Sequence, residues 1–256
     1  MTTPRIFSPE ILREGHRVDL ERENSQYIQN VLRLKMGDVV SLFDGRGSEH
    51  EAAITELSEG IITVEIGAKK RACLPDLKVT LAQSLPKGSK MDFIIQKSTE
   101  LGVDRIIPFM SSRSIPRLSE RKAVERRKRW ERIAVEACRQ CGRARIPEIR
   151  SIVTFEEMLE AKEEESLGIL LWEDETERGI KELLRDKRYG DSGDFFVIVG
   201  PEGGFSREEA ERAIARDFIS ASLGSLILRA ETAPLAILTI LQYEKGSFGQ
   251  AEKGAL

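Results

Sequence analysis

The chain has 256 residues with 40 Lys+Arg and 43 Asp+Glu, which gives a formal net charge of −3 at pH 7. This length allows one large domain or two modest ones, and the nearly balanced charge does not by itself indicate a nucleic-acid partner. No apolar run approaches the roughly 20 residues that a membrane-spanning helix needs, so we expect no membrane insertion.

The first 72 residues are rich in short strand signals. Alternating apolar residues predict strands at Val39–Phe43, Glu51–Leu57 and Ile61–Ile66, and Glu59-Gly60 predicts a hairpin turn between the last two. Ahead of these strands, the sequence of Ser25–Leu34 is typical of one short helix. This spacing predicts a small β-barrel or sandwich.

From Leu77 onward, strand and helix patterns alternate. The predicted strands are Val79–Leu85, Arg105–Phe109, Glu148–Val153, Gly168–Trp172, Phe195–Val199 and Ile219–Leu223. Such alternation favours a parallel sheet with helices on both faces. Charges and Pro75 interrupt the patterns near Lys70–Asp76, so we expect two domains, residues 1–72 and 73–256.

Charge is distributed unevenly along the second half. The stretch Arg113–Arg150 holds 13 Lys+Arg against 5 Asp+Glu, whereas Thr154–Asp186 holds 4 against 12. A helix is predicted over Glu120–Cys141, and its apolar stripe consists of Trp130, Ile133, Ala134, Ala137 and Cys141. The remaining cations form either a solvated face or a polyanion footprint, and arginines past the helix end favour the footprint.

The three cysteines, Cys73, Cys138 and Cys141, are an odd number in a chain without a signal peptide. We therefore expect free thiols in a reducing compartment and a cytoplasmic protein. Cys138 and Cys141 form C-x-x-C, but this motif ends a helix and both histidines are distant in sequence. The sequence thus supports neither a zinc site nor a thioredoxin-like motif, and we expect no metal.

The most informative stretch is a glycine turn that follows the apolar strand at Phe195–Val199. Its sequence is GPEGGFSREE, and Ser206 with Glu209 predicts a capping box for the next helix. Glycine lacks the Cβ that blocks close approach of a ligand to the backbone. The glycines do not match G-x-G-x-x-G, which argues against a phosphate cradle and a nucleotide-dependent oxidoreductase. From spacing alone, a ligand site and a plain tight turn are both open.

The last predicted helix, Ala233 to about Gln242, is apolar on nearly every side. Such a helix must be covered on several sides, so we expect either burial within one protomer or a homodimer interface.

Several motifs together resemble the RsmE family of S-adenosylmethionine-dependent methyltransferases, which belong to the SPOUT class. The signature at the glycine turn consists of Gly200-Pro201-Glu202-Gly203-Gly204-Phe205, Leu223-Gly224 and Ile227-Leu228-Arg229-Ala230-Glu231-Thr232-Ala233. Further blocks similar to the family occur in the same order at 81–88, 96–103, 129–137 and 140–143, and 31–38 is similar to its PUA-like RNA-binding domain. The resemblance covers nearly the whole chain.

The resemblance implies methylation of N3 of a uridine in 16S ribosomal RNA of the small (30S) subunit. It implies a PUA-like β-barrel, an α/β domain with a C-terminal trefoil knot, and a homodimer. The S-adenosylmethionine site is expected at Leu171, Val199, Gly200, Pro201, Glu202, Gly203, Gly204, Leu223, Gly224, Leu228, Thr232 and Ala233. Because its loops contact the cofactor through the main chain, glycine, leucine and proline fill the motif.

The resemblance also suggests functional side chains. Arg229 is expected to hold the uracil or its phosphate, because a guanidinium donates two hydrogen bonds and stays charged. Glu231 is a candidate for accepting the N3 proton, and its alternative role is to orient Arg229 or to cap the last helix. RNA contacts are expected from Arg33, Lys35, Arg113, Arg139, Arg143 and Arg145.

Two positions depart from the family pattern. Leu226 stands where many relatives have a basic residue, and Gln26-Tyr27 stands where many have histidine. Other SPOUT chemistries, on transfer RNA or on a ribose hydroxyl, stay open as alternatives, as does an RNA-binding assembly factor without catalysis.

Overall fold

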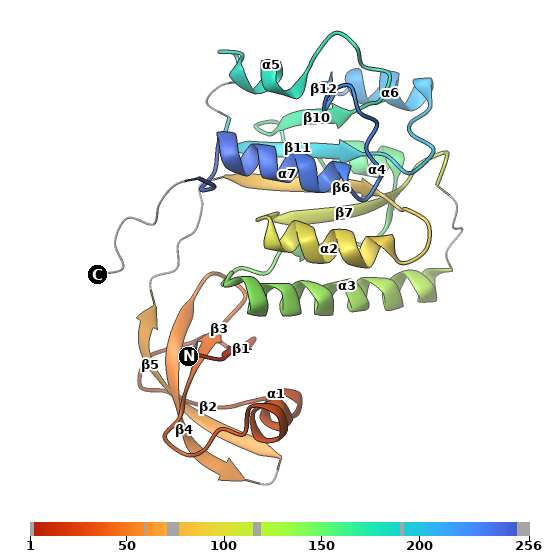
Figure 1. Cartoon of the computed structure of the whole chain (residues 1–256). Helices are drawn as coiled ribbons and strands as arrows, with labels where there is room; N and C mark the ends of the chain where they lie inside the picture. Colours follow the sequence, from red (N-terminus) through yellow and green to blue (C-terminus); the bar gives the residue numbers. More distant parts are fainter. Residues whose placement is uncertain (1–2, 59, 71–76, 115–118, 190–191, 250–256) are drawn as a thin grey trace. The chain divides into compact units, whose positions relative to one another are not determined.

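The computed structural model describes residues 3–58, 60–70, 77–114, 119–189 and 192–249 (Figure 1). The chain forms two compact units. Unit 1 consists of Met1–Leu74 and Val135–Ile146, and unit 2 of Pro75–Ala134 and Pro147–Leu256. Unit 1 therefore includes a segment from the middle of the chain, which a division of the sequence at one point does not foresee.

Unit 1 contains a five-stranded sheet with the order β1-β3-β4-β5-β2. Its strands are β1 (Arg5–Phe7), β2 (Arg17–Asp19), β3 (Val39–Phe43), β4 (Glu49–Ser58) and β5 (Ile61–Lys70). β1 runs parallel to β3, and the other neighbours are antiparallel. Along part of β4 and part of β5, every second side chain is buried, as the alternating sequence predicts. The two strands pair as predicted, although Glu59 of the turn lies outside the described residues.

The helix predicted at Ser25–Leu34 is present but begins earlier and ends sooner. It starts as α1 (Arg22–Gln26) and continues as a π-helix, η1 (Tyr27–Leu32). Arg33 ends it in a left-handed conformation with φ of 55°. Ile28 is fully buried in the apolar core of unit 1, so the helix packs on the sheet.

An arginine from β1 fixes the end of the long basic helix α3 (Glu120–Cys141) within unit 1. The guanidinium of Arg5 donates to the carbonyl oxygens of Cys138, Arg139 and Arg143 and pairs with Glu49 at 2.8 Å. Cys138 and Arg139 lie in the last turn of α3, where a helix leaves carbonyl oxygens without helical partners, and Arg143 follows the helix end. The Cys138 carbonyl also accepts from Gly142 N at 3.2 Å. The side chains of Arg5 and Glu49 are only 14% exposed. Arg5 therefore holds the residues that follow α3 in a defined place.

Unit 2 is built on a parallel sheet with the order β12-β10-β11-β6-β7-β8, and β9 also pairs with β7. The strands are β6 (Lys78–Ser84), β7 (Arg105–Met110), β8 (Glu148–Ile149), β9 (Val153–Thr154), β10 (Leu167–Leu171), β11 (Asp194–Val199) and β12 (Phe218–Ala221). Each pairing is parallel, which confirms the predicted parallel sheet. The single strand predicted at Glu148–Val153 is instead two short strands, because β8 and β9 meet opposite ends of β7.

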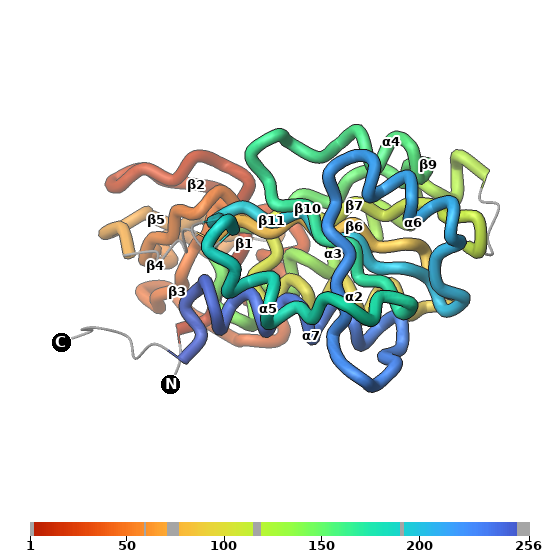
Figure 2. The backbone as a smooth tube through the Cα atoms, turned by 90° about the horizontal axis from the view of Figure 1, so that it is seen from above, coloured from red at the N-terminus to blue at the C-terminus, as the bar shows by residue number. Residues whose placement is uncertain are grey.

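Helices cover both faces of this sheet (Figure 1, Figure 2). They are α2 (Lys90–Glu100), α4 (Phe155–Glu160), α5 (Ile180–Arg185), α6 (Arg207–Ile214) and α7 (Ala233–Glu244). α4 and α6 pack on one face around a core that includes the rings of Phe109, Phe196 and Phe205. α2 and α7 lie side by side on the opposite face.

The apolar stripe predicted for α3 is buried at Trp130, Ala134 and Ala137. Cys138 is fully buried, whereas the predicted stripe residue Cys141 is half-buried. Near the helix end, the buried face therefore includes Cys138, which the predicted stripe does not contain. None of the helices in the described part of the chain is long and apolar enough to cross a membrane.

Glu49 should contribute to stability only when it is ionised. Burial acts to raise the pKa of Glu49, but the hydrogen bonds from Arg5 and Ser41 outweigh it and leave the pKa below its ordinary value. Its stabilising effect is therefore fully present above a pH of about 4.5 and is lost as the pH falls through the lower folded-state pKa. We expect Glu49→Gln to lower the free energy of unfolding by about 1.5 kcal/mol at pH 7 and by less at a pH of about 3.

Urea unfolding at the two pH values measures this difference. Glu65→Gln is the matched control, because Glu65 also pairs with an arginine across two strands but is 48% exposed. The control should change the free energy of unfolding little, since exposed ion pairs contribute little. Equal losses for the two variants would contradict the assignment.

Candidate functional site

The strand order of unit 2 reverses between β6 and β11. From β6 the chain adds β7 and β8 on one side and later builds β10, β11 and β12 on the other. In parallel sheets, ligands bind outside the carboxyl ends of the strands near such a reversal. A cavity of about 440 Å³ lies at that edge. Its lining residues are Leu171, Trp172, Glu173, Val199–Gly204, Ala221–Gly224, Leu226–Ala230 and Ala233.

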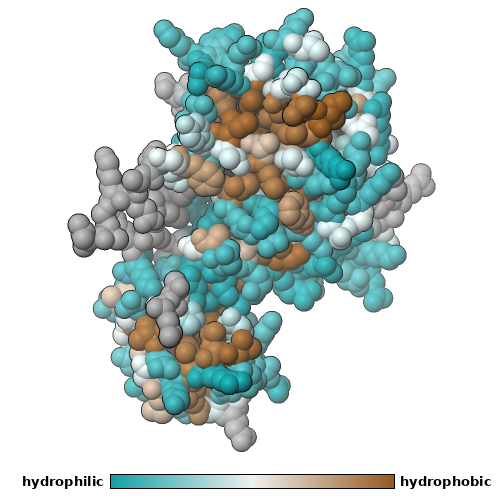
Figure 3. Space-filling view, in the orientation of Figure 1, coloured by the Kyte–Doolittle hydropathy of each residue, from teal (hydrophilic) through white to brown (hydrophobic). Residues whose placement is uncertain are grey.

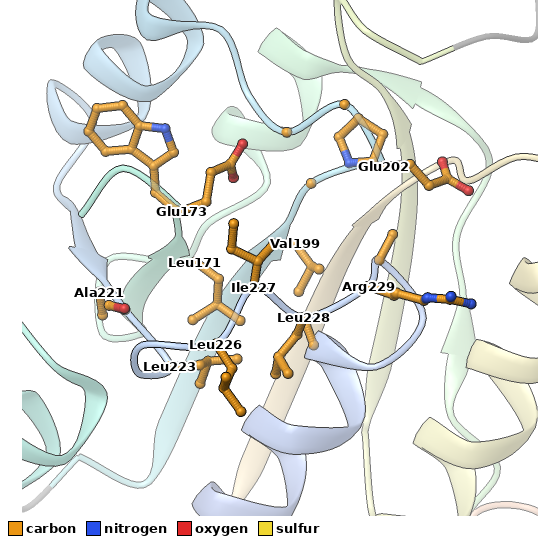
Figure 4. Close-up of a pocket in the computed structure, with 18 of the residues that line it drawn as sticks. Leu171, Glu173, Val199, Glu202, Ala221, Leu223, Leu226, Ile227, Leu228 and Arg229 are labelled. Atoms are coloured by element: carbon orange, nitrogen blue, oxygen red, sulfur yellow. The ribbon is translucent and has the colours of Figure 1, made fainter. Parts of the chain in front are cut away.

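The interior of the cavity is apolar. Leu171 and Val199 end β10 and β11, and Figure 4 shows them facing Leu223, Leu226, Ile227 and Leu228 of the loop before α7. The side chains of Leu226 and Ile227 are 78% and 88% exposed, which is unusual for apolar residues. The cavity therefore offers an apolar surface that is open on one side.

The glycine turn after β11 forms one wall. Gly204 has φ of +65°, and a Cβ at this position would overlap the carboxylate of Glu173. The next helix begins with the predicted capping box, because the Ser206 hydroxyl accepts from Glu209 N and the Glu209 carboxylate accepts from Ser206 N. The turn is thus fixed on both sides, and glycine is required at its end.

A second loop holds the glycine turn from outside. Ser112 donates from both its backbone N and its hydroxyl to the buried carboxylate of Glu209, at 2.7 and 2.9 Å. Arg113 Nη1 donates to the carbonyl oxygen of Gly203 at 2.8 Å. Arg113, which the sequence suggests as an RNA contact, therefore also supports the turn.

A cluster of one lysine and two glutamates lies beside the cavity, and we call it the Lys90 cluster (Lys90, Glu202 and Glu231). Lys90 Nζ is 2.9 Å from Glu202 Oε1 and 3.0 Å from Glu231 Oε2. Glu202 also accepts from the backbone N of Lys87. The cluster connects α2, the glycine turn and the segment before α7.

Opposite charges set the ionisation of the Lys90 cluster. Burial acts to raise the pKa of Glu202 and of Glu231, but the Lys90 ammonium outweighs it, and both pKa values lie below the ordinary value. The ion pairs with Glu202 and then with Glu231 raise the pKa of Lys90. All three groups are therefore charged at neutral pH.

Arg229 stands at the rim of the cavity. Figure 4 shows its guanidinium extending away from the apolar lining. The side chain is exposed, and within the described ranges it has no hydrogen bond or ion pair. Its backbone carbonyl accepts from the N of Thr232 at 2.8 Å, so the turn before α7 fixes its position.

The structure brings the sequence-predicted cofactor residues together. All of them line the cavity except Thr232, which precedes α7. Of the two predicted catalytic residues, Arg229 lines the cavity, whereas Glu231 lies outside its lining and pairs with Lys90.

Sequence reasoning missed Lys90 and several lining residues, which are Trp172, Glu173, Ala221, Ser222, Leu226, Ile227 and Ala230. Trp172 ends a predicted strand and Glu173 follows it, so the rule that ligands bind at carboxyl ends of strands would have found them. Ser222 directly follows the observed strand β12, which ends two residues before the predicted one. Lys90 has no comparable signal.

The predicted RNA-binding residues of unit 1 occupy two places. Arg33 and Lys35 follow η1. Arg139, Arg143 and Arg145 lie at the end of α3 and just beyond it. Arg139 is engaged, since it donates to Asn24 at 3.2 Å and stacks over the ring of Tyr27. Arg145 is exposed.

The thiol and acidic groups show no metal site in the described ranges, where no group of three His, Cys, Asp or Glu residues is placed to hold an ion. Cys138 and Cys141 are free, and Cys73 lies outside the described residues. Burial raises the pKa of Cys138 to about 12. That thiol is therefore not reactive at neutral pH.

Comparisons with known proteins agree with this site. Residues 73–242 match the model of an RNA methyltransferase domain, and residues 20–67 match that of an RNA methyltransferase PUA domain. Ribosomal RNA small subunit methyltransferase E of Bacillus subtilis is 32% identical and covers 91% of this chain and 92% of its own length. The protein of the same name from Buchnera aphidicola (Acyrthosiphon pisum) is 33% identical, with 96% and 95% covered.

Solved structures are similar over the whole length. Ribosomal RNA small subunit methyltransferase E from Neisseria gonorrhoeae, bound to S-adenosyl methionine, has a TM-score of 0.88 and 35% identity, with 96% of this chain and 100% of that chain covered. A Legionella pneumophila methyltransferase in complex with the same cofactor has a TM-score of 0.82 and 32% identity, with 96% and 99% covered.

Gly204→Ala should be destabilising because of the left-handed backbone at this position. The matched control is Gly88→Ala, because Gly88 has a similar φ of +68° but open space around a Cβ. The left-handed conformation should cost each variant about 1 kcal/mol of unfolding free energy. The two losses should be similar, since the exposed carboxylate of Glu173 can move away from the new Cβ. Thermal and urea unfolding compare the two, and a clearly larger loss for Gly204→Ala would show that Glu173 constrains this position.

Proposed function

Because this chain belongs to the ribosomal RNA small subunit methyltransferase E family, we propose that it methylates N3 of a uridine in 16S ribosomal RNA. It is an S-adenosylmethionine-dependent ribosomal RNA methyltransferase, as the matched domain and the relatives over more than nine-tenths of the chain indicate. The single observation that carries the proposal is the cavity at the carboxyl ends of β10, β11 and β12, formed by the glycine turn and the segment before α7.

The residues of the cavity fit this cofactor. The apolar surface around Leu171, Val199 and Leu228 suits an adenosine, and the glycine turn lets the backbone approach a ligand closely. Glu173 lines the cavity and has no hydrogen bond or ion pair in the described part of the chain, so its carboxylate is available to a positively charged group. The buried indole Nε1–H of Trp172 also lacks a partner among these residues.

When bound, S-adenosylmethionine supplies a methyl group on a sulfonium. The protein must align the acceptor with that methyl and exclude water, because the transfer is an in-line displacement. We propose that Leu226 and Ile227 cover the reacting groups, since they are apolar and lie at the open side of the cavity. This assigns a function to Leu226, where relatives often have a basic residue.

Uracil N3 carries a proton at neutral pH and must lose it before methylation. We propose that the exposed guanidinium of Arg229 binds the uracil oxygens or its phosphate and stabilises the anion. Glu231 is the second catalytic candidate. Its lowered pKa and its pairing with Lys90 make it a weak base, which favours the alternative role of positioning Arg229.

We propose the family architecture for the chain, with a PUA-like barrel over residues 1–72 and a methyltransferase domain over 73–256. The five-stranded sheet of unit 1 and the parallel sheet of unit 2 support it. We further propose that the C-terminal part is threaded as a trefoil knot. In support, the glycine turn that follows β11 and the segment Leu223–Ala230 that follows β12 meet at one cavity.

The exposed apolar surface of unit 2 supports a homodimer. α7 buries Pro234, Ile237, Leu238 and Leu241 on one face, while Tyr243 on the other is 69% exposed. Figure 3 shows apolar side chains gathered on the face that carries α7. A second copy of the chain would cover them, as the apolar character of the helix predicts.

For the substrate, we propose 16S ribosomal RNA within the small (30S) subunit, in the cytoplasm where subunits are assembled. Arg33, Lys35, Arg113, Arg139, Arg143 and Arg145 are the proposed phosphate contacts. Among the arginines at and beyond the end of α3, Arg145 is the best candidate for a phosphate contact because it is exposed, whereas Arg139 already binds Asn24. Phosphate contacts of this kind weaken as salt rises.

The activity is tested with purified protein, 30S subunits from a strain that lacks the enzyme, and labelled S-adenosylmethionine. Nucleoside analysis of the RNA should show label in N3-methyluridine of 16S RNA only. Naked 16S RNA and transfer RNA serve as competing substrates. Label in transfer RNA or in a ribose would favour another SPOUT activity, and cofactor binding without any transfer would favour an assembly factor.

Arg229→Ala should slow methyl transfer strongly while cofactor binding is preserved. Loss of a charge-assisted contact to the reacting group is worth about 100-fold in kcat/KM. Arg229→Lys should recover only part of this, because an ammonium cannot donate two parallel hydrogen bonds. Single-turnover methylation and calorimetry with S-adenosylmethionine separate the two effects. A parallel loss of cofactor affinity would contradict the proposed role.

A further inference from the structure

Among the described residues, Lys90 is the one whose side chain forms ion pairs with both Glu202 and Glu231. It is the first residue of α2, whereas Glu202 lies in the glycine turn and Glu231 lies in the turn before α7. Lys90 precedes both glutamates by more than a hundred residues in the sequence. The ammonium therefore joins three parts of the chain at a single atom.

The formal charges in and beside the Lys90 cluster are balanced. Glu202 and Glu231 carry two negative charges, and Lys90 and Arg229 carry two positive ones. Lys87 contributes its backbone N to Glu202. Arg229 is close enough to Glu231 to lower its pKa, yet its guanidinium has no hydrogen bond or ion pair in the described residues. Both carboxylates are instead occupied by Lys90.

An arginine beside a carboxylate normally pairs with it, and a paired guanidinium would be less available to a substrate. Here Lys90, rather than Arg229, pairs with Glu231. Removal of the Lys90 charge would leave the Glu231 carboxylate without its lysine, and the guanidinium of Arg229 would then turn toward it. The glycine turn and the segment before α7 would at the same time lose their common partner.

We propose that Lys90 is a positioning residue of this active site, which holds Glu202 and Glu231 together and so leaves the guanidinium of Arg229 free for the RNA. The inference rests on the proposed function for its substrate. In this inference, Glu231 supports Arg229. The observations behind it are the distances from Lys90 Nζ to Glu202 Oε1 and Glu231 Oε2, which are 2.9 and 3.0 Å.

The first test measures hydrogen exchange in the cofactor-free protein, which does not depend on any activity. Lys90→Met should speed exchange about tenfold in both segments, residues 201–204 and 229–232, since two ion pairs to these segments are lost. Lys97→Met is the matched control. Lys97 lies on the same helix, is likewise 35% exposed and pairs with Glu100 at 2.8 Å. It should change exchange only within α2.

The second test separates positioning from plain stabilisation. Lys90→Met should raise the KM for 30S subunits about tenfold, and Lys90→Arg should restore the KM to within about threefold. Adding Glu202→Gln and Glu231→Gln to Lys90→Met should lower the KM again, because no carboxylate is left to capture Arg229. A purely structural lysine would predict that the triple variant is worse than the single one.

The outcomes distinguish this inference from the proposed function. Identical behaviour of Lys90→Met and Lys97→Met, or faster exchange in only one of the two segments, would overturn the role of Lys90. Wild-type protein that does not methylate ribosomal RNA would overturn the proposed function, while the exchange data would still decide whether Lys90 holds the two segments.

Discussion

The parallel direction of every strand pair in unit 2 is the constraint on which the site depends. Parallel strands place all their carboxyl ends at one edge, so β10, β11 and β12 deliver their following loops to the same place. The strands themselves are buried on both faces by helices, as parallel sheets require. The sheet therefore needs apolar strands, and the chemistry is left to the loops that follow them.

Within those loops, apolar and charged groups are kept apart. Leucines and valine line most of the interior of the cavity, whereas the Lys90 cluster and Arg229 stand at its rim. The exception is Glu173, which lines the cavity but is exposed to solvent. The separation follows from electrostatics, because an unpaired charge inside an apolar cavity would be costly to desolvate. It also keeps the charges at the border where an RNA would arrive. The cavity can thus hold a ligand mainly by shape and backbone contacts.

Periodicity in the sequence predicted the elements of the fold well. The parallel sheet, the limits of α3 and the capping box at Ser206 followed from local patterns of apolar and capping residues. The family motif placed most of the cavity lining. Contacts between distant segments had no such local signal. Lys90 reads in the sequence as an ordinary solvated lysine, and only the fold brings it to Glu202 and Glu231. The same holds for Arg5, which reaches the end of α3.

The contact between Arg5 and the end of α3 also bears on how the chain folds during its synthesis. Domains generally fold as units in the order in which they are made. Unit 1, however, contains Val135–Ile146, so its N-terminal strands cannot complete their contacts until more than half of the chain has been translated. By then the first strands of unit 2 have also been made. Unit 1 can therefore be completed only after the first strands of unit 2, and before the rest of unit 2 has been made.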